Sequence, residues 1–89
     1  MGSELRDLAQ SFSETDWPVL ERLNETGAAT ATDLAVRLRK MTEVIAPKLK
    51  EFQAKGLVEA TPLEGVDREE IYRVSDKGRK VLRLVQLVR

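Results

Sequence analysis

Residues 30–58, TATDLAVRLRKMTEVIAPKLKEFQAKGLV, decide the fold that we expect for this chain. The stretch reads as two short helices joined by a tight turn, followed by Gly56 and the start of a strand. Thr30 or Thr32 can cap the first helix, because a hydroxyl oxygen accepts from an otherwise unpaired backbone N–H. Helical spacing places three apolar side chains on one face of that helix: Leu34, Ala35 and Leu38.

The second helix of this stretch repeats the apolar spacing. Ile45, Leu49 and Phe52 fall at i, i+4 and i+7, so we expect them to point into the core. A helix anchored on one side, with small and basic residues on the other, is suited to the major groove of DNA. The outward face then carries Glu43, Ala46, Pro47 and Lys50, with Lys48 on its flank.

Pro47 lies inside this second helix, where its ring removes a backbone hydrogen bond. One interpretation is functional: Pro47 displays a flat apolar ring toward a partner. The other is structural, with a shifted helix start or a mild kink, and we favour it.

Composition limits both the size and the chemistry of the domain. The chain has 89 residues, with 15 basic and 15 acidic side chains, no cysteine and no histidine. It therefore has no disulfide framework, no thiolate metal site and no histidine base, so we expect no cofactor, no metal site and no enzyme activity. An acidic cluster could attract a divalent cation loosely, although a solvated loop is the favoured interpretation: Glu64, Asp67, Glu69 and Glu70.

We expect one small domain over residues 4–89, with residues 1–3 as an expression scar or a disordered tail. The sequence contains no apolar run of membrane-spanning length and no signal-peptide pattern, so we expect no membrane contact and a cytoplasmic location.

Charge is unevenly distributed along this neutral chain. Residues 1–36 carry two basic and seven acidic side chains, whereas residues 37–55 carry six basic and two acidic ones. Residues 56–89 carry seven basic and six acidic side chains. A basic segment centred on the second helix fits nucleic-acid binding, although single charges usually line solvated faces.

The flanking segments show helical and strand patterns. Leu5, Leu8 and Phe12 share one face of a short amphipathic helix. A second helix is expected from Asp16 or Trp17 to Asn24 or Glu25. The later elements are expected as a strand at 57–61, a loop at 62–69, a return strand at 71–75 and an unusually apolar helix from 79 to about 88.

This order resembles a winged helix-turn-helix domain, a mainly α fold with a small β-ribbon (α+β) and, here, extra N- and C-terminal helices. Three segments resemble the MarR and ArsR-type families of transcriptional regulators: Thr32-Asp33-Leu34-Ala35, Phe52-Gln53-Ala54-Lys55-Gly56-Leu57-Val58 and Tyr72-Arg73-Val74-Ser75-Asp76-Lys77-Gly78. The resemblance covers roughly residues 13–84.

The resemblance implies how such a domain would meet double-stranded DNA. Thr42 with Arg39 and Lys40 would lie near phosphates at the turn, and Arg68 in the 62–70 wing would approach a flanking groove. Lys48 could neutralise a further phosphate. The major-groove set would be Glu43, Ala46, Pro47 and Lys50.

The chain also departs from these families. Ala46 and Pro47 stand where hydrogen-bonding side chains are usual in these families, so we expect few hydrogen bonds to base edges. The wing is acidic overall, and the cysteine and histidine ligands of an ArsR metal site are missing.

Two functions remain open from the sequence. The first is a DNA-binding transcriptional regulator that reads duplex DNA with the 42–55 helix and the 62–70 wing. The alternative is a winged-helix protein–protein interaction module from a larger replication or transcription protein. The apolar terminal helices suggest a homodimer, or else packing within one chain, and the expected interface residues are Leu5, Leu8, Phe12, Leu84, Val85 and Val88.

Overall fold

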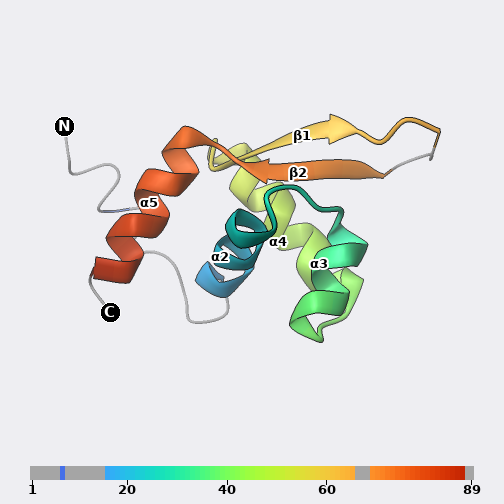
Figure 1. The fold of residues 1–89 in the computed structure, drawn as a ribbon, viewed down its shortest axis with the longest axis horizontal. Helices are drawn as coiled ribbons and strands as arrows, with labels where there is room; N and C mark the ends of the chain where they lie inside the picture. The colour runs from blue at the N-terminus through green and yellow to red at the C-terminus, as the bar shows by residue number, and fades with distance from the viewer. Residues whose placement is uncertain (1–6, 8–15, 66–68, 88–89) are drawn as a thin grey trace.

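The protein was analysed as a computed structural model that describes residues 7, 16–65 and 69–87. Helices α2, α3 and α4 are followed by a β-ribbon and a closing helix, α5. Figure 1 shows α5 and α3 at opposite ends of the helical layer. The expected winged helix-turn-helix architecture is confirmed. The elements are α2 (Trp17–Thr26), α3 (Ala31–Leu38), α4 (Thr42–Ala54), β1 (Val58–Pro62), β2 (Glu70–Val74) and α5 (Asp76–Leu87).

One apolar core joins these elements. Among the residues that the structure describes, the buried set contains no polar or charged side chain apart from the phenol of Tyr72. No described helix combines the length and the apolar character that crossing a membrane requires. The core residues are Val19, Leu20, Leu23, Ala29, Leu34, Ala35, Ile45, Leu49, Phe52, Leu57, Val58, Tyr72, Val74, Val81, Leu82 and Val85.

The ribbon is antiparallel, with Val58 opposite Val74 and Ala60 opposite Tyr72. Its inner face is therefore apolar, whereas Glu59 and Arg73 of the other face are exposed. Ala29, just before α3, extends the pairing through two backbone hydrogen bonds with Tyr72, of 3.0 and 2.8 Å. This bridge fixes the ribbon beside the beginning of α3.

The closing helix begins at Asp76, one turn before the expected Arg79, so that boundary was wrong. Ser75 explains the difference, because its Oγ accepts the Gly78 N–H at 3.0 Å and donates to the Gly56 carbonyl at 2.7 Å. The hydroxyl thus caps α5 and ties it to the end of α4.

Close contact at Gly78 holds α5 against the ribbon. Gly78 is buried, and a Cβ added there would collide with the Leu57 carbonyl oxygen and come within 2.7 Å of Val74 Cγ1. We therefore expect that only glycine, which has no Cβ, fits at this helical position.

Gly78→Ala should lower the free energy of unfolding by about 2 kcal/mol, because overpacking outweighs the better helix propensity of alanine. Urea unfolding followed by circular dichroism measures the change. The matched control is Lys80→Ala, at an exposed position of the same helix. Equal stability of the two variants would contradict the close approach.

Candidate nucleic-acid interface

The turn between α3 and α4 is built from backbone hydrogen bonds. The N–H of Lys40 donates to the Ala35 carbonyl at 2.9 Å, and that of Arg39 to the Val36 carbonyl at 3.2 Å. Arg39 adopts a left-handed conformation, with φ of 57°. This is the pattern of a Schellman helix end with arginine where glycine is usual. It ends α3 sharply and sets the direction of α4.

The beginning of α3 has a side-chain cap, and the structure decides between the two expected threonines. The Oγ1 of Thr30 accepts the Asp33 N–H at 3.1 Å, whereas Thr32 lies inside the helix and is exposed. Arg37 and Asp33 form an i, i+4 ion pair on the outer surface of the same helix. The start of α3 is therefore fixed beside the ribbon and α4.

The inner face of α4 is anchored as predicted. Ile45, Leu49 and Phe52 are at most 3% exposed. The helix begins at Thr42 and continues through Pro47, so of the two structural interpretations of this proline the shifted start is wrong, and the mild kink stays a prediction. The described side chains of Glu43, Pro47 and Lys50 are exposed, and those of Thr42 and Ala46 are half-buried.

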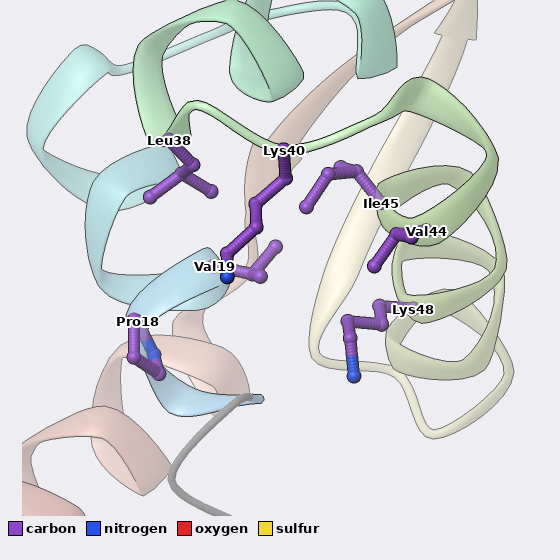
Figure 2. Close-up of a pocket in the computed structure, with 7 residues that line it drawn as sticks. All are labelled: Pro18, Val19, Leu38, Lys40, Val44, Ile45 and Lys48. Carbon is purple, nitrogen blue, oxygen red and sulfur yellow. The ribbon is translucent and has the colours of Figure 1, made fainter.

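Lys48 lies on a different side of α4 from Lys50. Two residues along a helix correspond to a rotation of about 200°. The Lys48 Nζ lies 2.6 Å from Asp16 Oδ1, next to the start of α2. Lys40 also reaches toward α2 (Figure 2), so these two lysines do not extend the surface around Lys50. Both line a groove of about 440 Å³ with Pro18, Val19, Leu38, Val44 and Ile45.

Lys50 contacts the ribbon. Its Nζ donates to Glu70 Oε1 at 2.5 Å and lies 5.7 Å from the centre of the Tyr72 ring. Hydrogen bonds to Glu70 and then to Tyr72 raise the pKa of the Lys50 ammonium above its ordinary value, because they favour the charged form. Beside this pair is a hollow of about 210 Å³ between α3, α4 and β2.

The pairing of Lys50 with Glu70 was not predicted. The sequence places Glu70 in the acidic wing, with no partner on α4 predicted. The sequence offers only a weak signal, namely an acidic residue at the foot of the return strand, because the contact depends on how the ribbon packs on α4.

The remaining predicted residues fall into three groups. Arg39 and Lys40 are exposed at the turn. Val85 is 2% exposed in the core of its own chain, and Leu84 packs partly against that core. The expected dimer contact of Val85 is therefore not available. Five predicted residues lie outside the described part of the chain: Leu5, Leu8, Phe12, Arg68 and Val88.

Three exposed apolar residues of α3, α4 and the turn between them were not predicted from the sequence. Val36 on α3, Met41 in the turn and Val44 on α4 are 72%, 66% and 45% exposed. Exposed apolar side chains gathered on one part of a small domain indicate a contact surface.

Solved structures share the fold of this chain. No family model and no curated protein matches the sequence. A mutant of MarR from E. coli, solved with operator DNA, has 20% sequence identity and a TM-score of 0.78; the match covers 94% of this chain and 62% of that one. A MepR-like protein solved with pseudoligands has 21% identity and a TM-score of 0.80, with 94% and 59% covered.

The AntR antimony-specific transcriptional repressor has 22% identity and a TM-score of 0.71, with 85% of this chain and 64% of that chain covered. At these identities the shared property is the fold, a MarR-type winged helix-turn-helix. The present chain spans about three fifths of the length of these proteins.

Thr30→Val should lower the free energy of unfolding by about 1 kcal/mol, because it removes the cap of α3 without changing the side-chain shape. Thr32→Val is the matched control and should change stability by less than about 0.5 kcal/mol. Thermal or urea unfolding measures both. A larger loss at Thr32 would mean that the cap is wrongly assigned.

Proposed function

We propose that this chain is a DNA-binding transcriptional regulator that acts in the cytoplasm and reads duplex DNA with α4 and the 62–70 wing. The observation that carries the proposal is the orientation of α4, whose inner face is buried and whose opposite face is free. The same fold in MarR has been solved on operator DNA, which supports this partner.

In this proposal the exposed face of α4 enters the major groove. Glu43 can accept a hydrogen bond from a cytosine amino group, and Pro47 and Ala46 can contact apolar base edges. Arg39 at the turn, with Thr42, would contact phosphates, which positions the protein without specifying sequence. Lys40 is left out of the proposed contacts, because it reaches toward α2. Lys48 is left out of the proposed contacts, because it lies on a different side of α4 from Lys50 and is directed toward Asp16. Arg68 remains a proposed wing contact.

The proposed function predicts salt-dependent binding. In a titration of labelled duplex, the logarithm of the association constant should fall linearly with the logarithm of salt concentration. Lys50→Glu should weaken binding at least about tenfold, because it places a second carboxylate beside Glu70 on the proposed DNA face.

Lys80→Glu provides a matched control, since it makes the same charge change at an exposed position of α5. It should weaken binding by less than about threefold. Equal losses in the two variants, or binding that does not respond to salt, would contradict reading by α4.

We also propose that the protein is a homodimer, with contacts from the terminal segments. Leu87 near the end of α5 is 75% exposed, and Leu84 is only partly covered. An exposed leucine beside a second apolar side chain favours burial against a partner. Because Val85 is buried in its own core, the proposed α5 contacts are Leu84 and Leu87.

Leu87→Glu should raise the dimer dissociation constant about tenfold or more, since burial of a leucine contributes about 1.5–3 kcal/mol. Sedimentation velocity over a range of concentrations measures it, with Lys80→Glu as control. A folded wild-type monomer at high concentration would refute the dimer.

The three exposed apolar residues of α3, α4 and the turn between them support a second candidate, a protein–protein interaction module. Val36, Met41 and Val44 offer exposed apolar area on a chain that has no net charge, which suits a protein interface. Under this alternative, Val44→Asp would abolish capture of a protein partner, and Lys50→Glu would leave that capture unchanged.

A further inference from the structure

The lysines of α4 and its C-terminal cap all have carboxylate partners. Lys48 pairs with Asp16 at 2.6 Å, Lys50 with Glu70 at 2.5 Å and Lys55 with Glu51 at 3.1 Å. The helix that would contact DNA therefore presents neutral pairs in place of three separate ammonium groups. Of these lysines, only Lys50 lies on the exposed side that the proposed function assigns to the groove.

We propose that Glu70 is an affinity-setting residue, which competes with DNA phosphate for the ammonium of Lys50. The inference rests on the proposed DNA-binding function. Duplex DNA then gains the Lys50 contact only when the pair with Glu70 opens, so the intact pair lowers the affinity for every DNA sequence alike.

The position of Glu70 makes it an effective competitor. Glu70 is the first residue of β2, and its backbone is paired with Pro62 in the ribbon. Its side chain is 29% exposed, compared with 57% for Lys50. A carboxylate held on a strand loses less conformational freedom in forming a pair than one on a mobile loop.

Tyr72 adds a second attraction on the same strand. The Lys50 Nζ lies 5.7 Å from the ring centre, within the range of a cation–π contact, and the Tyr72 side chain is 4% exposed. The ring therefore favours the Lys50 position in which the ammonium reaches Glu70. A phosphate must draw the ammonium away from both groups.

The surroundings of the pair also disfavour a phosphate there. Glu69 and Glu70 both line the hollow between α3, α4 and β2, together with Lys50. Two carboxylates and one ammonium give this hollow a net negative charge, which repels phosphate until the charge of Glu70 is removed. Glu69 has the same charge as Glu70, and no described ion pair includes it.

A double-mutant cycle that measures duplex binding separates the effect of the Lys50–Glu70 ion pair from the effect of one negative charge. Glu70→Gln should tighten binding about fivefold more than Glu69→Gln, which removes the same charge from the adjacent residue. Lys50→Gln should then reduce the affinity for duplex DNA by a factor about five times larger in the Glu70→Gln background than in the wild type. In the Glu69→Gln background it should cost the same as in the wild type.

The inference would be overturned by equal increases in DNA affinity for the two glutamate variants, or by an equal loss of affinity from Lys50→Gln in every background. Thermal melting confirms that each variant is folded. A second arm uses heparin, a polyanion without bases, in the same cycle. If no variant binds duplex DNA but the heparin cycle shows the coupling, the proposed function fails and the role of Glu70 stands. A heparin cycle without coupling would refute that role.

Discussion

The structure depends on burial of the inner side of α4 by Ile45, Leu49 and Phe52. These three side chains fix the rotation of the helix about its axis, and through it the direction of every other α4 residue. Loss of that anchor would leave Lys50 and Lys48 without defined positions. The left-handed Arg39 and the capped start of α3 add the second constraint, since they set the angle at which α4 leaves the turn.

Electrostatics at this surface follow from packing more than from composition. The basic segment 37–55 suggests a positive patch, yet in the folded protein α2 and β2 each bring a carboxylate to one of its lysines. Such pairs are individually weak when exposed. Their effect here is on direction, because each pair points an ammonium toward a particular neighbouring element. The net positive charge around α4 is consequently smaller than the basic segment 37–55 indicates.

The Ser75 and Gly78 pair joins the two halves of the domain. Ser75 caps α5 and hydrogen-bonds to the Gly56 carbonyl, while Gly78 lets the helix lie against the Leu57 carbonyl. The ribbon is thereby held between α5 on one side and the Ala29 bridge on the other. A ribbon supported in this way keeps Glu70 and Tyr72 within contact distance of Lys50. The fold thereby sets the charge of the proposed interface.

The sequence by itself determined the order of elements, the buried face of α4 and the end of that helix shortly before Gly56, because each rests on local spacing or on one residue's backbone preference. Only the tertiary structure decided that Lys48 pairs with Asp16, that Lys50 pairs with Glu70 and that Val85 is buried in its own chain. Those outcomes bring together residues 32 and 20 positions apart, or depend on which helix covers α5. Periodicity specifies which side of an element is apolar, whereas the neighbour that each polar side chain meets is set by how the elements pack.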